Sequence, residues 1–191
     1  MRQPNTILEI VYADICGPMQ EPDFWGHRYF ALFDCGKSRY KFLCFLFQRS
    51  NVLQVFKVFK NWSEKQFSTH LRVLHTDGGG EFNSKDLHAW LALVGIDHVT
   101  TPPYSAHMNG ACEVWNRVIV HTASAILLTT YLPLSFWPQP TLCATYLLNH
   151  SPTKGLCLRC TPYEALHGKL ALHWTHSNLS VPRICTYTQG N

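Results

Sequence analysis

The sequence predicts an α/β fold in which helices cover a mixed five-stranded sheet. Three short segments rich in β-branched and aromatic residues come first, and helix-like and strand-like segments alternate after them, in the order β-β-β-α-β-α-β-α. Hydrophobic residues make up 46% of the 191 residues and charged residues only 15%, which argues against disorder and for a buried core. This length suits one domain.

The first half of the chain is predicted to hold three strands and a helix. We expect the strands at residues 7–15, 28–33 and 40–47. In the first strand, Asp14 shares one face with Ile10 and Tyr12, because side chains alternate along a strand. Residues 51–62 change to a spacing of three and four between apolar residues, which predicts a helix.

The second half is predicted to alternate between strands and helices. We expect strands at residues 71–77 and 96–101 and helices at 85–94 and 111–128. Ser84 can cap the first of these helices and Gly95 can end it. Residues 102–110 (PPYSAHMNG) hold so many breakers that we expect a loop. The packing side of the last helix is predicted to carry Val114, Val118, Thr122, Ala125 and Ile126.

The stretch LRVLHTDGGGEF places Asp77 and three glycines directly after a strand. Such glycines could cradle a phosphate, but the spacing does not match a P-loop, which needs Gly-Lys-Ser/Thr after four residues. It does not match a dinucleotide-binding loop either, because Asn83 stands where the third glycine belongs. The remaining interpretation is that Asp77 is one ligand of a metal site.

Two further acids could join Asp77 at such a site. Asp14 lies in the first strand, and Glu113 lies near the start of a helix, separated from Asp77 by the 35 residues 78–112. Three ionised carboxylates can converge only around a cation, and Mg²⁺ is a hard ion that prefers oxygen ligands. Each acid also has a simpler interpretation: a satisfied buried carboxylate, the first residue of a turn, or a favourable charge near a helix start.

Several motifs resemble the integrase catalytic core of copia-type LTR retrotransposons, a family of retroviral-type integrases. They are YADICGPM, TDGGGEF, PPYSAHMNGACEVWNR, LPLSFW, TYLLNHSPTKG and TPYEALHGK, and they span about residues 8–169. The resemblance implies an RNase H-like fold whose sheet has the strand order 3-2-1-4-5, which brings Asp14 beside Asp77. The interval of 35 residues before Glu113 is the hallmark of the family's D,D(35)E motif.

The resemblance also implies a chemistry and its residues. Asp14, Asp77 and Glu113 would bind two Mg²⁺ (or Mn²⁺) ions that support end processing and strand transfer of element DNA into target DNA. Tyr104, Asn109, Asn116 and Arg117 would contact the DNA ends. Expected partners are therefore element and target DNA and further copies of the chain, acting in the nucleus or earlier in a cytoplasmic virus-like particle.

Departures from the family pattern leave a second function open. Val114 and Trp115 stand where the family has basic residues, which should weaken attraction to phosphates. Pro138 and Pro140 interrupt a segment where the family has a helix. The alternative is a catalytically inactive relict or domesticated nucleic-acid-binding module on the same fold. A ribonuclease H-type nuclease is a third option, but it would not show the 35-residue spacing.

The remaining features bound the organisation of the chain. The core is expected to cover residues 1–169 and a degenerate extension residues 170–191, as a piece of a larger polyprotein or a decayed copy of one. Cys157 and Cys160, followed after twelve residues by His173 and then His176, approach zinc-finger spacing, but the histidines are one residue too close. The eight cysteines form no disulfide framework, and no apolar run is long enough to span a membrane, so we expect an intracellular protein.

Overall fold

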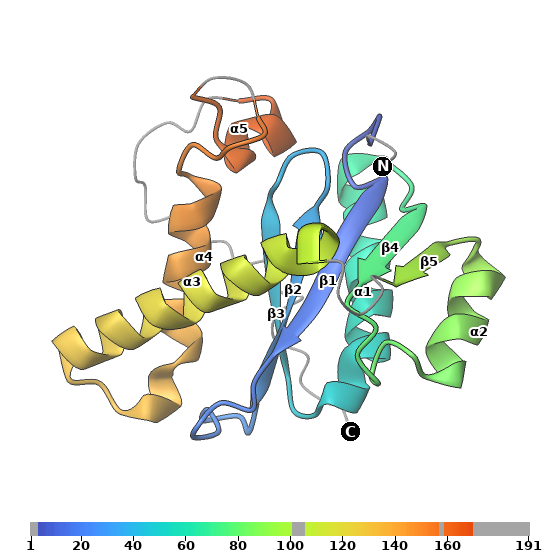
Figure 1. Ribbon diagram of the computed structural model, residues 1–191. Helices are drawn as coiled ribbons and strands as arrows, with labels where there is room; N and C mark the ends of the chain where they lie inside the picture. Colours follow the sequence, from blue (N-terminus) through green and yellow to red (C-terminus); the bar gives the residue numbers. More distant parts are fainter. Residues whose placement is uncertain (1–3, 101–105, 157–158, 170–191) are drawn as a thin grey trace.

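The computed structural model describes residues 4–100, 106–156 and 159–169, with the backbone alone for residues 106–113. A five-stranded sheet with the order β3-β2-β1-β4-β5 forms its centre, as predicted (Figure 1). The strands are β1 (Ile10–Cys16), β2 (Tyr29–Cys35), β3 (Lys41–Leu46), β4 (Val73–Thr76) and β5 (Asp97–Thr100). The longer helices are α1 (Val52–Phe67), α2 (Lys85–Val94), α3 (Ala106–Thr130) and α4 (Pro138–Asn149), and the short ones are η1 (Arg49–Asn51), η2 (Leu134–Phe136) and α5 (Pro162–His167).

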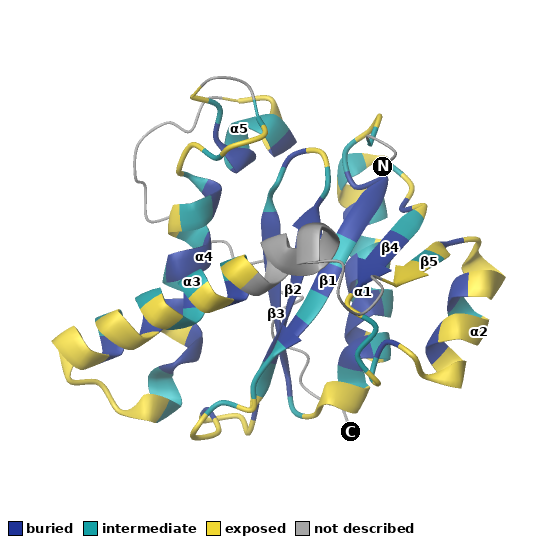
Figure 2. Ribbon diagram, viewed as in Figure 1, coloured by how far each residue is buried: buried dark blue, intermediate teal, exposed yellow. Residues whose placement is uncertain are grey.

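The sheet is mixed because β1 pairs with β2 in antiparallel and with β4 in parallel orientation. Two cross-strand phenylalanine pairs show how β2 and β3 bury both faces. Phe33 pairs with Phe42, and both rings contact α1. Phe30 pairs with Phe45, and both rings contact Trp137 before α4. Phe30 and Phe33 are an odd number of residues apart, so alternation along the strand sends them to opposite faces. Figure 2 shows the resulting burial of β2 and β3.

Helix α2 has the ends that the sequence predicts. The Ser84 hydroxyl accepts a hydrogen bond from the Leu87 amide, and Gly95 ends the helix with a positive φ. All five predicted strands are present. The helix predicted at residues 51–62 runs on to Phe67, where an ion pair between Lys60 and Glu64 joins successive turns.

The loop predicted for residues 102–110 is wrong for its second half, because α3 begins at Ala106. Asn109 and Gly110 each disfavour a helix by only about 1 kcal/mol or less. Extending a helix that already exists avoids the unfavourable nucleation step, so a long helix can absorb both residues. Residues 102–105 lie outside the described part of the chain.

The predicted packing side of α3 is also wrong. Val114 is 48% exposed, and Ala125 is exposed as well. Among the described side chains of the helix, the buried ones are Asn116, Ile119, Ala123 and Leu127. This stripe is rotated relative to the prediction, which assumed that the valines would face the sheet. The burial of a polar residue, Asn116, in the stripe indicates that this face contacts something polar.

Both prolines of α4 lie in its first turn. Pro138 is the first residue of the helix and Pro140 the third. Amide groups in the first turn have no partner within the helix, so proline loses nothing there. None of the helices in the described ranges combines the length and apolar character needed to cross a membrane.

Candidate functional site

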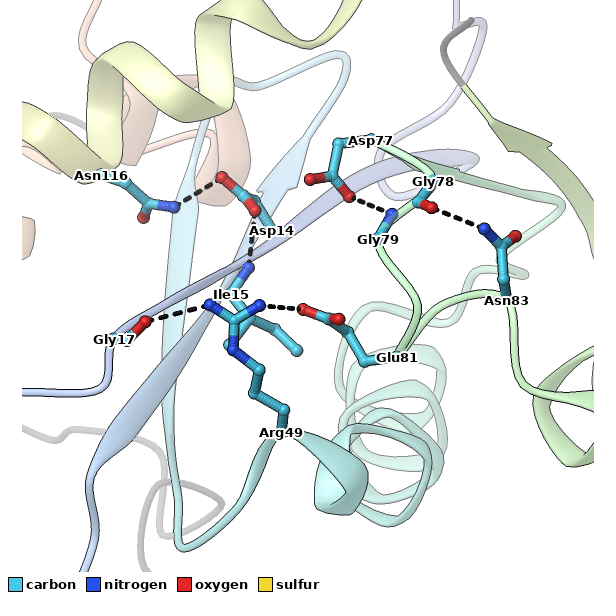
Figure 3. Close-up of polar contacts among 10 residues, drawn as sticks. All are labelled: Asp14, Ile15, Gly17, Arg49, Asp77, Gly78, Gly79, Glu81, Asn83 and Asn116. Atoms are coloured by element: carbon cyan, nitrogen blue, oxygen red, sulfur yellow. Dashed lines mark hydrogen bonds and ion pairs between the residues drawn. The ribbon is translucent and has the colours of Figure 1, made fainter. Parts of the chain in front are cut away.

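Asp14 lies on β1, on the face of the sheet that α3 crosses (Figure 3). Its Oδ1 atom accepts a hydrogen bond from the Ile15 amide at 2.8 Å. Its Oδ2 atom accepts one from the side-chain amide of Asn116 on α3, also at 2.8 Å. Two donors from different elements therefore hold the carboxyl group in one orientation.

Asp77 directly follows β4 and begins the glycine loop. Its Oδ1 atom accepts a hydrogen bond from the Gly79 amide at 2.9 Å, which closes a tight turn. Gly78 has a φ of 78°, a backbone conformation that favours glycine. The Asn83 side chain donates to the Gly78 carbonyl and closes the loop from its other end. The glycines thus serve a compact turn around the Asp77 carboxylate.

The pairing of β1 with β4 brings the two aspartates together. Residues 10, 11 and 12 of β1 align in order with residues 73, 74 and 75 of β4. Continued for two further residues, the same register sets Asp14 opposite Asp77. Figure 3 shows the two carboxyl groups as neighbours on one side of the sheet. The predicted adjacency of these two strands is confirmed.

The other predicted site residues belong to α3 or to the segment before it. The backbone of Glu113 lies in α3, three residues before Asn116, so both residues are on neighbouring turns of the same helix face. The Glu113 and Asn109 side chains and the whole of Tyr104 lie outside the described residues. Arg117 is exposed. Asn116, predicted as a DNA contact, is 7% exposed and bonded to Asp14; its contact with DNA stays a prediction.

One residue near the aspartates was missed by the sequence analysis. Arg49, in the short helix η1, forms an ion pair with Glu81 of the glycine loop, with Nη1 and Oε1 2.9 Å apart. No local sequence pattern indicates this contact. The partners of Arg49, Gly17 and Glu81, lie 32 residues before and after it in the sequence. Only the folded sheet brings them together.

Burial and nearby charge shift the pKa values of two side chains close to the aspartates. The pKa of the Cys16 thiol is raised to about 11, chiefly by burial and secondly by the Asp14 charge. Burial lowers the pKa of His75, whose ring stacks on Tyr12 with 4.9 Å between centroids. The acids are therefore flanked by a neutral thiol and a neutral imidazole at pH 7.

The donors at this site suit a hard divalent cation. Asp14 and Asp77 offer carboxylate oxygens from adjacent strands, the kind of ligand that Mg²⁺ and Mn²⁺ prefer. Within the described residues, no group of three His, Cys, Asp or Glu side chains could hold a metal ion. The third carboxylate of the predicted set, Glu113, is not among the described side chains. Of the rival zinc residues, Cys160 is a free cysteine and the other three lie outside the described ranges.

Comparison with known proteins identifies the family. The family model of the integrase core domain matches residues 2–106. The Pol polyprotein from transposon TNT 1-94 of Nicotiana tabacum is 36% identical over 150 residues, and that from transposon RE1 of Arabidopsis thaliana is 35% identical over 162 residues. These matches cover 78% and 84% of this chain but only 11% of each polyprotein. The chain therefore corresponds to a small part of the length of these relatives.

Solved structures share the fold. A chain of the simian T-cell lymphotropic virus intasome in complex with PP2A regulatory subunit B56 gamma has a TM-score of 0.67 at 14% identity. The match covers 91% of this chain and 59% of that one. The HTLV-2 integrase catalytic core domain in complex with magnesium has a TM-score of 0.57 at 16% identity, and the match covers 84% of this chain and 97% of that one. The family model and the identity to these relatives show that the chain belongs to the integrase core domain family, in a group related to the Pol polyproteins of plant retrotransposons.

Proposed function

We propose that this chain is the catalytic core of a retrotransposon integrase, which joins element DNA to target DNA by phosphodiester transfer. The observation that carries the proposal is the β1–β4 register, which sets Asp14 opposite Asp77 on one side of the sheet. Membership in the integrase core domain family supports the reaction class. The position of Glu113 on the helix that crosses Asp14 supports its role as the third acid.

In this proposal, Asp14, Asp77 and Glu113 hold two Mg²⁺ or Mn²⁺ ions. When bound, such ions stabilise the negative charge that develops on phosphate oxygens during transfer. The protein contributes orientation. Asn116 fixes one oxygen of Asp14 and the Gly79 amide fixes one oxygen of Asp77, so both carboxylates are held in place before substrate arrives.

Contacts with DNA are proposed for the residues around α3. Arg117 is exposed on this helix and could pair with a phosphate oxygen. We extend the proposal to Tyr104 and Asn109 on the basis of their positions in the motif before Glu113. Further copies of the chain and both DNA partners complete the proposed assembly, which would act in the nucleus.

The inactive binding module is kept as a second candidate because of Val114 and Trp115, which stand where the resemblance leads us to expect basic residues. The centroid of the Trp115 ring lies 4.2 Å from the Lys41 ammonium, so this side chain packs against the protein itself. The neighbouring Val114 is 48% exposed, so a basic residue at that position could reach a phosphate. Loss of that cation lowers the electrostatic share of DNA binding. The fold can therefore persist in a copy that binds DNA more weakly.

The test is a joining assay with a labelled terminal-repeat duplex and Mn²⁺. We expect nicked or joined products from the unchanged chain. Asp77→Asn should reduce them at least about 100-fold, because a neutral amide is a poor ligand for a hard cation. Asp97→Asn is the matched control, since Asp97 is an exposed acid on β5, outside the acid set. DNA binding without any product in Mg²⁺ or Mn²⁺ would favour the inactive module.

A further inference from the structure

Arg49 connects the ends of the two strands that present the acids (Figure 3). Its Nη1 atom lies 2.9 Å from Glu81 Oε1, and its Nη2 atom donates to the Gly17 carbonyl oxygen at 3.0 Å. Gly17 directly follows β1, three residues after Asp14, and Glu81 lies four residues after Asp77. One guanidinium group thus contacts both of the segments that carry the acids.

On the β4 side, the carboxyl groups of Asp77 and Glu81 both lie beside Gly79. A Cβ atom added to Gly79 would lie 3.2 Å from Asp77 Oδ1 and 3.2 Å from the Glu81 carboxyl carbon. The two carboxyl groups therefore lie against the same glycine, whose amide also donates to Asp77. Because the Gly79 amide donates to Asp77 and Glu81 lies beside the same glycine, we expect a displacement of Glu81 to alter the position of the Asp77 carboxylate.

On the β1 side, Gly17 is fixed against the neighbouring strand. A Cβ atom added to it would lie 2.7 Å from the Arg28 carbonyl oxygen and 2.8 Å from the Tyr29 ring. The Arg49 guanidinium lies 5.7 Å from the centroid of the same ring, within reach of a cation–π interaction. Arg49 thereby contacts a closely packed segment at the end of β1.

We propose that Arg49 is a positioning residue that holds the Asp77 turn at a fixed distance from the end of β1, and so sets the separation of Asp14 and Asp77. The forked guanidinium is essential, because one planar group donates in two directions at once. Its effect on ion binding depends on the proposed function; its effect on the loop does not.

A purely electrostatic role for Arg49 makes the opposite prediction. A nearby positive charge opposes the binding of a cation, so Arg49→Met would then tighten ion binding, and Arg49→Lys, which keeps the charge, would leave it unchanged. If Arg49 instead acts as a brace, that is, as the positioning residue proposed above, both changes weaken Mn²⁺ binding. Methionine has no donor, and the single ammonium of lysine cannot donate in the same two directions as the guanidinium. The lysine variant therefore separates the two explanations.

The experiment measures Mn²⁺ affinity by calorimetry on the full chain without DNA. We expect both Arg49 variants to bind Mn²⁺ about tenfold more weakly, as is common when the partner of a ligand-bearing segment is removed. Arg72→Lys is the matched control, because Arg72 is an exposed arginine just before β4. Since Arg49 is itself 47% exposed, the variants are expected to fold. Wild-type affinity in Arg49→Lys would overturn the brace.

A second measurement is independent of the ion. Amide hydrogen exchange across residues 78–83 should become about tenfold faster in both Arg49 variants, with the exchange of β2 and β3 unchanged. If the unchanged chain binds no Mn²⁺, the proposed ion site fails, and faster exchange in this loop still supports the brace. Unchanged exchange in both variants would refute it.

Discussion

Asp14 is held by two donors that differ in kind. The Ile15 amide belongs to the same strand, and the Asn116 side chain comes from a helix that crosses the sheet. Because the two donors bind different oxygens, they fix both the plane and the rotation of the carboxyl group. In the described part of the chain, the Asn116 carbonyl oxygen has no hydrogen-bond partner. Burial of this side-chain oxygen (Oδ1) without a partner costs free energy, and it accompanies the hydrogen bond from Asn116 Nδ2 to Asp14.

Gly79 allows a prediction about the turn at Asp77. In Gly79→Ala, the new methyl group meets Asp77 Oδ1 and the Glu81 carboxyl carbon at 3.2 Å, closer than comfortable contact, so the Asp77 carboxylate must move. We expect Mn²⁺ affinity to fall about tenfold. Calorimetry would measure the change.

The matched control is Gly80→Ala, because a Cβ atom at Gly80 meets no atom within 4 Å. Its Mn²⁺ affinity should stay within about twofold of the unchanged chain. Equal losses in both variants would mean that loss of backbone freedom, rather than contact with Asp77, explains the effect.

Strand geometry is the reason why the backbone positions of Asp14 and Asp77 could be predicted from the sequence. Alternation along β1 and the end of an apolar run at Asp77 place both acids at definite points of the backbone. Arg49 could not be found in this way, because its partners are distant in sequence and no local pattern marks them. Asn116 was recognised as a site residue, but its bond to Asp14 depends on which side of α3 faces the sheet.

A side chain of α4 hydrogen-bonds to the backbone of β3. Asn149 Oδ1 accepts a hydrogen bond from the Lys41 amide, and Asn149 Nδ2 donates to the Lys41 carbonyl oxygen, both at 2.8 Å. Asn149 is 3% exposed, so water cannot replace either bond. A side-chain amide has a donor and an acceptor side by side, which is the arrangement that a peptide group of a further strand would offer.

This contact predicts a large effect for Asn149→Ala. The substitution removes the two buried hydrogen bonds that Asn149 makes with Lys41, which should lower the free energy of unfolding by about 2–4 kcal/mol. Asn149→Asp keeps the acceptor and loses the donor, so a smaller loss is expected. Urea denaturation measures both. A loss below about 0.5 kcal/mol in the alanine variant would mean that water reaches the site.

Helix α3 shows why element boundaries and faces are harder to predict than element types. Its existence follows from the apolar spacing after residue 111, but its start at Ala106 depends on the extension of a stable helix through Asn109 and Gly110. Its buried stripe combines Ile119, Ala123 and Leu127 with Asn116, which bonds to Asp14, and it leaves Val114 exposed. Apolar periodicity alone gives the wrong rotation for this helix.

For the whole molecule, sheet topology is the property that assembles the site. β1 and β4 are separated in the sequence by two strands and by the helices η1 and α1, yet they are neighbours in the sheet. The strand order followed from the motifs of the family, while the alternation of strands and helices predicted only a mixed sheet. The division between a core and an extension at residue 170 stays a prediction, because residues 170–191 are outside the described ranges.

Half-buried histidines predict how the stability of the whole chain depends on pH. Burial lowers the pKa of His98, with a further contribution from the charge of His88, and burial also lowers the pKa of His167. In the unfolded chain these residues bind protons near their ordinary pKa of about 6.5, whereas the folded chain resists protonation. Acidification below about pH 6.5 therefore favours the unfolded state, and the melting temperature should fall.

The variant His98→Gln isolates one of these groups. The Nε2 atom of His98 lies 3.0 Å from Thr76 Oγ1, and glutamine can keep a hydrogen bond to that hydroxyl. The melting temperature of the variant should fall less than that of the unchanged chain between pH 7.5 and 5.5. If the melting temperatures of the variant and the unchanged chain fall equally over this pH range, His98 does not contribute to the pH dependence of stability.

The contact of Asn149 with Lys41 has a consequence for how separate molecules meet. Among the described strands, β3 is the outermost on its side of the sheet. An outermost strand can pair with a strand of another molecule. At Lys41, the first position of this strand, the outward backbone groups are already occupied by an intramolecular amide. Pairing with a strand of another molecule is thereby hindered at this end of β3.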